Sequence, residues 1–368
     1  MHPLSAVVLA AGEGTRMRSV RPKPLHRLCG RAMVLHVLDA VAELEVDRAV
    51  VVVGHAADRV SKALAEQAPP GLMLEFVEQQ VPAGTGDALS VAMTAFAGAD
   101  DDLDPEHEAD LIVLAGDTPL LRPPTLAALV RRHRGDGNSA TVLTARLPDP
   151  TGYGRVLRGR DGGVARIVEQ RDTNEEEAAV DEVNVGIYVF RRGLVAPTLR
   201  RLTPANAQGE YYLTDTVQVL ARAGYKVGSM VMDDPTEAAG VNDRAQLAAA
   251  EAELRDRINE RWMRRGVTMI DPERTYLDTS VELASDVCLY PGTILQGRTK
   301  VQAGAEIGPD TRLVDCQVGP GAVVEGVVGR QASIGAGARV GPFVVLHPGS
   351  SVAADAITGS HLVVTPDT

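Results

Sequence analysis

The chain has 368 residues, of which 45% are hydrophobic, and its formal net charge is −12 at pH 7. This length predicts two or three domains with a substantial core, and the acidic balance argues against a nucleic-acid-binding surface. The 3 cysteines are widely spaced, which indicates neither a disulfide framework nor a metal site. Because Glu13 and Arg16 interrupt the first apolar run and no other run is long enough to span a membrane, we expect a cytoplasmic protein without a signal peptide.

A glycine-rich stretch with two basic residues follows the first apolar run. Residues 6–10 are small and aliphatic, which predicts a buried parallel strand. Gly12 and Gly14 then allow backbone N–H groups to point at an anion, while Arg16 and Lys23 supply positive charge. A helix is predicted next, with an apolar face made of Val34, Val37, Leu38 and Val41. Together these features indicate a phosphate-binding site, although a tight strand–helix turn with unrelated basic residues is the alternative.

Two common phosphate-binding motifs do not fit this stretch. The Walker motif requires Gly-Lys-Ser or Gly-Lys-Thr at the start of the helix, and that sequence does not occur there. The dinucleotide-binding fingerprint requires a third glycine where Met17 stands, and an acidic residue after the second strand, where the chain has Val53, Gly54 and His55.

The stretch resembles the signature loop of sugar-nucleotide pyrophosphorylases. Its segments LAAGEGTRM, PKPLH and GRAM are similar to those of the bacterial N-acetylglucosamine-1-phosphate uridyltransferases, as is NAQGEYYLTD at residues 206–215. Members of that family are bifunctional, with a uridyltransferase joined to a left-handed β-helix that carries an acetyltransferase. The resemblance implies that Arg16 and Lys23 are catalytic. It also implies that the substrates are held by Leu9, Ala10, Gly12 and Gly14.

The first two-thirds of the chain alternates apolar strands with helices. After the strand at 6–10, strands are predicted at 49–53, 72–77 and 111–115, with a helix at 88–97 between the last two. This alternation predicts an α/β fold with a mostly parallel, Rossmann-like sheet covered on both faces. Ligands bind beyond the carboxyl ends of the strands in such sheets, and the polar motifs of this chain follow those ends.

The segment QQVPAGTGDAL carries an amide and several small residues. The Gln79 side chain can pair with a carbonyl and an N–H of a pyrimidine, and small residues let the backbone approach a flat base. The resemblance implies that Gln79, Gly84 and Thr85 read the uracil. Asp87 departs from the family, which usually has histidine there. A glycine-rich helix start is the alternative interpretation.

Two polar residues are candidates for binding a metal ion. Asp117 directly follows the fourth strand, where a carboxylate can hold a divalent cation against phosphates, although a turn aspartate before Pro119 is the alternative. The resemblance implies that Asn242 is the second protein ligand of Mg²⁺, although it could instead cap the helix that follows. The acidic run at 100–110 is interpreted as a solvated loop.

Three further positions match residues that surround the sugar in the family. They are Gly154, Glu169 and Asn184. A carboxyl and an amide group suit hydrogen bonding to sugar hydroxyls or to an N-acetyl group.

The last third of the chain changes character. Residues 242–265 predict one long helix that ends at Gly266, and helical periodicity disappears after about Val281. Aliphatic residues then recur every six positions: Leu289, Leu295, Val301, Ile307 and Leu313, and after an offset Val328, Ile334, Val340, Leu346 and Val352. Such hexapeptide repeats predict a parallel β-helix, and the resemblance implies a left-handed helix and a homotrimer.

The resemblance weakens in the acetyltransferase part. His347 stands where the family has an arginine, and Thr365 falls where it has a lysine. The remaining residues of that site would lie beyond Thr368. We therefore expect no acetyl transfer.

We predict a uridyltransferase domain at 1–241, a linker helix at 242–266 and a short β-helix at 267–368. The predicted reaction converts UTP and N-acetylglucosamine 1-phosphate into UDP-N-acetylglucosamine and pyrophosphate, with Mg²⁺ as cofactor. The alternatives are the same chemistry on another sugar or nucleotide, and a non-catalytic trimer that binds nucleotide sugars.

Overall fold

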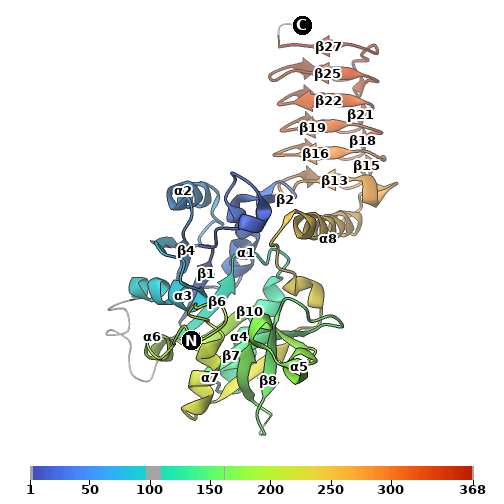
Figure 1. Ribbon diagram of the computed structural model, residues 1–368. Coiled ribbons are helices and arrows are strands. Elements are labelled where there is room, and N and C mark those ends of the chain that lie inside the picture. Colours follow the sequence, from blue (N-terminus) through green and yellow to red (C-terminus); the bar gives the residue numbers. More distant parts are fainter. Residues whose placement is uncertain (1–2, 97–108, 161, 367–368) are drawn as a thin grey trace. The chain divides into compact units, whose positions relative to one another are not determined.

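The computed structural model describes residues 3–96, 109–160 and 162–366. The chain folds into two compact units, one formed by residues 1–26 and 32–246 and the other by residues 27–31 and 247–368. Each unit has its own hydrophobic core. Figure 1 labels the principal elements of both.

A nine-stranded sheet forms the centre of the first unit. Its main path runs through β11 (Val227–Val231), β7 (Ala140–Arg146), β10 (Glu182–Arg191), β6 (Asp110–Ala115), β1 (Leu4–Leu9), β4 (Ala49–Val53) and β5 (Leu74–Glu78). Among these described strands, β10 alone runs antiparallel to its neighbours. Two further strands, β8 (Gly154–Arg158) and β9 (Val164–Val168), extend the sheet from β10. The expected mostly parallel α/β sheet is confirmed.

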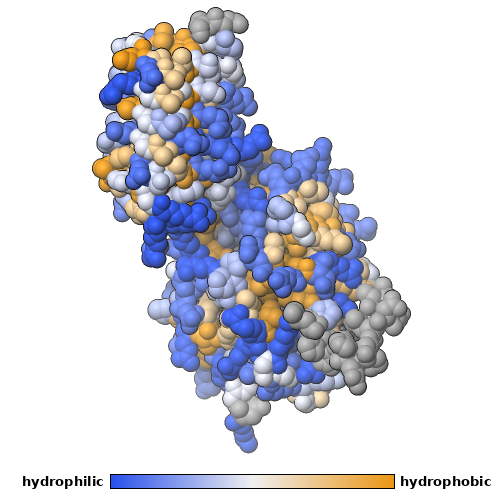
Figure 2. Space-filling model, turned by 180° about the vertical axis from the view of Figure 1, so that it is seen from behind, coloured by the Kyte–Doolittle hydropathy of each residue, from blue (hydrophilic) through white to orange (hydrophobic). Residues whose placement is uncertain are grey.

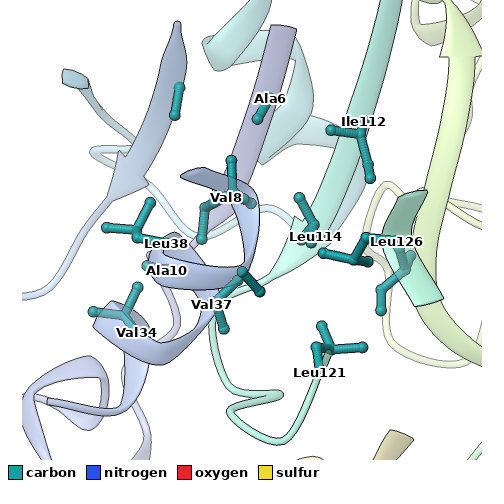
Figure 3. Close-up of a cluster of buried hydrophobic side chains, with 14 of the residues drawn as sticks. Ala6, Val8, Ala10, Val34, Val37, Leu38, Ile112, Leu114, Leu121 and Leu126 are labelled. Carbon is teal, nitrogen blue, oxygen red and sulfur yellow. The ribbon is translucent and has the colours of Figure 1, made fainter. Parts of the chain in front are cut away.

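Helices cover both faces of this sheet. One face packs against α1 (Met33–Ala42), α2 (Ala57–Gln67) and α4 (Pro123–Gly135), and the other against α3 (Thr85–Met93), α6 (Arg192–Leu199) and α7 (Asp215–Arg222). Successive residues of β1 alternate between the two cores: Ala6 and Val8 belong to one and Val7 to the other. Figure 3 shows the α1 side chains gathered against β1. The predicted apolar face of this helix is therefore confirmed.

The remaining elements of the first unit are short. They are the 3₁₀ helices η1 (Thr15–Met17), η2 (Lys23–Leu25), η3 (Thr94–Phe96), η4 (Gln170–Asp172) and η5 (Pro235–Ala238), and the helix α5 (Glu175–Ala178). The strand pair β2 (Arg27–Leu28) and β3 (Arg31–Ala32) follows η2, and its residues 27–31 belong to the second unit. Most of the acidic run lies outside the described residues. Asp110, at its end, is not solvated: it is buried in β6 and accepts a hydrogen bond from Arg134 Nε at 2.6 Å.

The long helix α8 (Arg244–Met263) leads into the second unit, two residues later at its start than expected. The helix ends at Met263, two residues earlier than expected, and a turn follows that closes at Gly266, whose φ of 91° is a backbone conformation that glycine adopts readily. The 3₁₀ helix η6 (Pro272–Arg274) follows. Three sheets of short parallel strands then make a left-handed β-helix, which Figure 1 shows as stacked coils.

The strands of the β-helix are two to four residues long. One sheet contains β12 (Thr268–Met269), β15 (Cys288–Leu289), β18 (Glu306–Ile307), β21 (Val323–Val324) and β24 (Arg339–Val340). A second contains β13 (Tyr276–Leu277), β16 (Ile294–Gln296), β19 (Arg312–Val314), β22 (Val327–Arg330), β25 (Val344–Leu346) and β27 (Val363–Val364). The third contains β14 (Glu282–Leu283), β17 (Lys300–Val301), β20 (Gln317–Val318), β23 (Ser333–Ile334) and β26 (Ser351–Val352).

Nine of the ten predicted repeat positions lie in the β-helix core. Those nine side chains are at most 8% exposed, whereas Val328 is 47% exposed, so its prediction as a core residue is wrong. Leu313 pairs with Gly329, only sixteen residues later, although a regular coil takes eighteen, as between Leu295 and Leu313. This shortened coil turns Val328 outward and puts Gly329 in the core column.

Candidate active site

The loop after β1 brings the first predicted cations to the carboxyl edge of the sheet. Gly14 has a φ of 65° and lies against Lys23, because a Cβ atom at Gly14 would be 2.6 Å from the Lys23 Cβ. A side chain at Gly14 would therefore displace Lys23. The two short 3₁₀ helices of the loop carry the cations, Arg16 in η1 and Lys23 at the start of η2.

Two cations and two oxygen donors meet at this edge. The Lys23 ammonium donates to the Asp117 carboxylate, with which it forms an ion pair, and to Asn242 Oδ1 at 2.9 Å. Arg16 Nη2 donates to the same amide oxygen, also at 2.9 Å. Asp117 follows β6 and Asn242 precedes α8, so the fold brings Asn242 to two cations that lie more than two hundred positions earlier in the chain.

Asn242 does not cap the helix that follows it. The backbone N–H of Gln246 donates to Asp243 Oδ1 at 2.8 Å, and the Gln246 side chain accepts from the Asn242 backbone N–H at 2.7 Å. Asp243 and Gln246 thus satisfy the first turn between them. The Asn242 amide oxygen is instead directed at the two cations.

The residues at this junction fit a divalent cation. A carboxylate and an amide oxygen are hard donors, and both already accept hydrogen bonds from one ammonium, so they converge on a point that favours positive charge. No group of three or more His, Cys, Asp or Glu side chains with metal-binding geometry occurs among the described residues. A metal ion here would therefore complete its shell with substrate oxygens or water.

A cavity of about 420 Å³ opens beside this junction. It is lined by ten of the predicted site residues: Leu9, Ala10, Gly12, Lys23, Gln79, Gly84, Thr85, Asp117, Glu169 and Asn184. Its volume lies in the range of small-molecule binding sites.

A second cavity of about 290 Å³ adjoins the first. It is lined by Arg16, Gly154 and Asn242 among others, and it shares Asp117, Glu169 and Asn184 with the larger cavity. Of the fourteen predicted site residues, thirteen therefore line one or both cavities. Gly14 lines neither and acts on the site by packing against Lys23.

Two segments distant in sequence form one wall of the larger cavity. The backbone N–H of Gly86 donates to the Tyr211 carbonyl at 2.7 Å, and that of Tyr211 donates to the Ala83 carbonyl at 2.8 Å. Thr85 Oγ1 accepts from the Leu213 backbone N–H at 3.1 Å. A Cβ atom at Gly84 would be 2.5 Å from the Tyr211 oxygen, so glycine is required for this approach.

Glu169 and Asn184, which line both cavities, form hydrogen bonds with neighbouring hydroxyl groups. Thr214 Oγ1 donates to Glu169 Oε1 at 3.1 Å, and burial raises the pKa of the Glu169 carboxyl above its usual value. The Asn184 amide donates to the Tyr188 hydroxyl at 2.8 Å, while its oxygen accepts from the Gly186 backbone N–H at 3.1 Å. Burial also raises the pKa of Tyr188, so its hydroxyl is neutral and can accept this bond.

Sequence reasoning missed some residues of the site. Tyr188 and Thr214 line the larger cavity and bond to predicted site residues, and Tyr153 lines the smaller one. The sequence pattern could have indicated Tyr188, because it follows Asn184 by four residues in β10 and residues four apart in a strand lie on the same face. Thr214 offers no such signal, because only the tertiary fold brings it to Glu169.

The sequence matches known families over nearly its whole length. Residues 6–215 match the MobA-like NTP transferase domain. The bifunctional protein GlmU of Streptomyces avermitilis is 45% identical over 98% of this chain and 73% of its own length. The GlmU proteins of Thermobifida fusca and Heliobacterium modesticaldum are 48% and 42% identical, over 91% and 96% of this chain and 68% and 74% of their own lengths.

The chain belongs to the GlmU family. The expected resemblance to the N-acetylglucosamine-1-phosphate uridyltransferases is thereby confirmed, and the chain is a nucleotidyltransferase that acts on small molecules with a divalent metal ion. None of the helices in the described part of the chain combines the length and the hydrophobicity that crossing a bilayer requires.

Proposed function

We propose that this chain transfers a uridylyl group, converting UTP and N-acetylglucosamine 1-phosphate into UDP-N-acetylglucosamine and pyrophosphate. The observation that carries the proposal is the convergence of Arg16, Lys23, Asp117 and Asn242 between two adjoining cavities. One cavity contains the amide of Gln79 and the other contains polar groups suited to a sugar. The charged junction between them is the place for the reacting phosphates.

The chemistry requires alignment and charge neutralisation rather than a general base. A phosphate oxygen of the sugar 1-phosphate is already ionised; it bonds to the α-phosphorus of UTP as the bond to the pyrophosphate oxygen breaks. The leaving pyrophosphate takes the electron pair. Arg16 and Lys23 stabilise the negative charge that develops there. The backbone at Gly12 leaves room for phosphate oxygens, because a Cβ atom there would meet nothing within 4 Å, while Gly14 packs against Lys23.

Asp117 and Asn242 would hold the metal ion, which we propose is Mg²⁺. When bound, this ion neutralises phosphate charge. The Asp117 carboxylate and the Asn242 oxygen suit Mg²⁺ because it prefers oxygen ligands and retains several water or phosphate oxygens. Both oxygens already accept hydrogen bonds from the Lys23 ammonium, which supports their role as acceptors for positive charge.

The base and the sugar are assigned to opposite ends of the site. Gln79, Gly84 and Thr85 line the larger cavity and would read the uracil. Glu169 and Asn184 lie on the wall that both cavities share, with Gly154 on the smaller one, and would contact the sugar hydroxyls and the N-acetyl group.

The β-helix offers a surface for the expected homotrimer. Val328, Val345 and Val363 are in register on successive coils of one sheet and point outward, with 47%, 39% and 54% exposure. Figure 2 shows hydrophobic residues exposed along one side of the β-helix. An apolar column of this kind supports association of β-helices through that sheet.

We also propose a cytoplasmic location. Cys29, Cys288 and Cys316 are free thiols, which suits a reducing compartment.

A panel of nucleotides and sugar phosphates tests the proposed reaction. Pyrophosphate release should be fastest with UTP and N-acetylglucosamine 1-phosphate, and slower with dTTP or glucose 1-phosphate. Preference for another pair would identify a related nucleotidyltransferase. Tight binding of the nucleotide sugar without turnover would instead favour a non-catalytic binding protein.

Substitution of the charged residues tests the site itself. Arg16→Ala and Asp117→Ala should each lower the rate of pyrophosphate release by about 100-fold or more, because each removes a charge that acts on the phosphates. The circular-dichroism spectrum should be unchanged. Arg21→Ala is the matched control, since Arg21 is exposed in the same loop and lines neither cavity. Full turnover in either site variant would contradict the assignment.

A further inference from the structure

The side-chain amide of Gln79 is held from behind by two acceptors. Gln79 directly follows β5 and is only 7% exposed, yet it lines the larger cavity. Its Nε2 donates to the Gly84 carbonyl at 3.2 Å and to Asp87 Oδ2 at 2.7 Å. Asp87 lies outside the set of described residues that line this cavity, so its contact with Gln79 is made from behind the wall.

The chemistry of these two partners fixes which way the amide faces. A backbone carbonyl and an ionised carboxylate can only accept hydrogen bonds, so both must receive N–H groups. Both N–H groups of Gln79 are thereby used. Its carbonyl oxygen is the group left for a ligand, and Gln79 can then act toward the cavity only as an acceptor.

We propose that Asp87 is a positioning residue that sets the base specificity of the site by locking the Gln79 amide in this orientation. A locked acceptor matches the N3–H of uracil and opposes cytosine, whose N3 is itself an acceptor. This inference rests on the proposed function, because it concerns the base end of the same site. If one hydrogen bond from the base distinguishes uracil from cytosine, this distinction depends on the contact that prevents the Gln79 amide from rotating.

A purely structural role for Asp87 is the competing explanation. Asp87 lies in the first turn of α3, where a negative charge stabilises the helix through its dipole. That role would change the stability of the protein and the use of all nucleotides alike. A role in orienting Gln79 would change the ratio between nucleotides.

The experiment compares Asp87→Asn with the wild type on UTP and CTP. An asparagine at this position can donate to Gln79 as well as accept, so the Gln79 amide can turn and offer N–H groups to the base. The ratio of kcat/KM for UTP to that for CTP should fall by about tenfold, the worth of one such bond, mainly through a higher KM for UTP. The kcat at saturating UTP should change little.

Two controls separate orientation from helix stability. Asp58→Asn removes the corresponding first-turn charge from α2, where Asp58 is exposed, and should leave the nucleotide ratio unchanged. In a Gln79→Ala background, adding Asp87→Asn should not alter the ratio further, because Asp87 acts through Gln79.

Different results overturn different claims. A wild-type enzyme that uses CTP better than UTP would overturn both the proposed function and this inference. If the wild type prefers UTP and Asp87→Asn leaves that preference intact, the inference alone fails, whatever happens to thermal stability.

Discussion

The Lys23 ammonium satisfies two acceptors at once, the Asp117 carboxylate and the Asn242 amide oxygen. The side chains of Lys23 and Asp117 are 13% and 29% exposed, so the pair is partly screened by water and can exchange partners when phosphates bind. Arg16 bonds to the same amide oxygen from a more exposed position. Asp117 and Asn242 therefore hold Arg16 and Lys23 in position beside the proposed phosphate site.

Glu169 is a residue whose ionisation opposes folding. Burial is the first cause of its raised pKa, and the Thr214 hydroxyl offsets this in part. The unfolded chain ionises this carboxyl near its ordinary pKa of about 4.3, whereas the folded chain keeps its proton to higher pH. The stability associated with Glu169 is therefore fully present below that ordinary pKa and is lost as the pH rises through the folded value.

Glu169→Gln should remove this pH dependence. The urea midpoint of the variant, minus that of the wild type, should increase as the pH rises from about 4 through the raised pKa, and then stay constant. Glu176→Gln is the control, because it makes the same substitution at an exposed position. A constant difference between Glu169→Gln and wild type at all pH values would contradict the burial argument.

At the scale of elements, the site depends on loops that hold one another. The first residues of α3, together with the residues just before it, are joined to the segment before α7 by three hydrogen bonds, and glycine at 84 and 86 permits their close approach. The segment before α7 is not a regular element, so propensity does not fix its shape. Each becomes a wall of the cavity only because the other is present.

The β-helix shows how a shortened coil is accommodated. At β22, Gly329 takes the core position between Leu313 and Leu346, and a Cβ atom there would already be 3.0 Å from Leu313 Cδ2. The neighbouring leucines fill the space that a side chain at 329 would need. A larger residue at this inward position would therefore require the Leu313 side chain to shift.

Gly329→Val should destabilise the second unit by about 1–3 kcal/mol, because its methyl groups would overpack the core. Guanidinium denaturation of the whole chain would measure the change. Val328→Thr is the matched control on the adjacent outward position and should be close to neutral. A stabilised Gly329→Val protein would show that the core column has unfilled space.

At the scale of the whole molecule, the proposed trimer can be separated from the proposed chemistry. Val345→Glu places a charge in the middle of the outward apolar column and should convert the trimer to monomers in sedimentation experiments. Ser333→Glu makes the same change on the exposed face of another sheet and should leave the trimer intact. A trimeric Val345→Glu protein would place the interface elsewhere.

Uridylyl transfer per chain should survive Val345→Glu. All fourteen predicted site residues belong to the first unit, so their hydrogen bonds do not require a neighbouring chain.

The expectation that acetyl transfer is absent stays a prediction. His347, which stands where the family has an arginine, is exposed on the β-helix. Measurement of acetyl-CoA consumption with glucosamine 1-phosphate tests the expectation.

The layered sheet and the hexapeptide coil were predictable from the amino-acid sequence alone, as were thirteen of the residues that line the two adjoining cavities. Apolar runs, six-residue spacing and the polar residues after strand ends are local signals, and each reflects burial that a regular element imposes. This is why residues 49–53 were predicted with the bounds of β4, and why nine repeat positions lie in the core.

The capping residue of α8, the direction of one β-helix side chain and several contacts of the site could be known only from the folded structure. In the folded structure Asp243 rather than Asn242 caps α8, and the Val328 side chain points outward. Tyr188 and Thr214 bond to predicted site residues, and Asp87 bonds to Gln79 from behind the cavity wall. Each of these depends on which polar group meets which partner across the fold, or on how much space a core column leaves. These contacts depend on how segments that are far apart in the chain pack together, so a local sequence pattern cannot predict them.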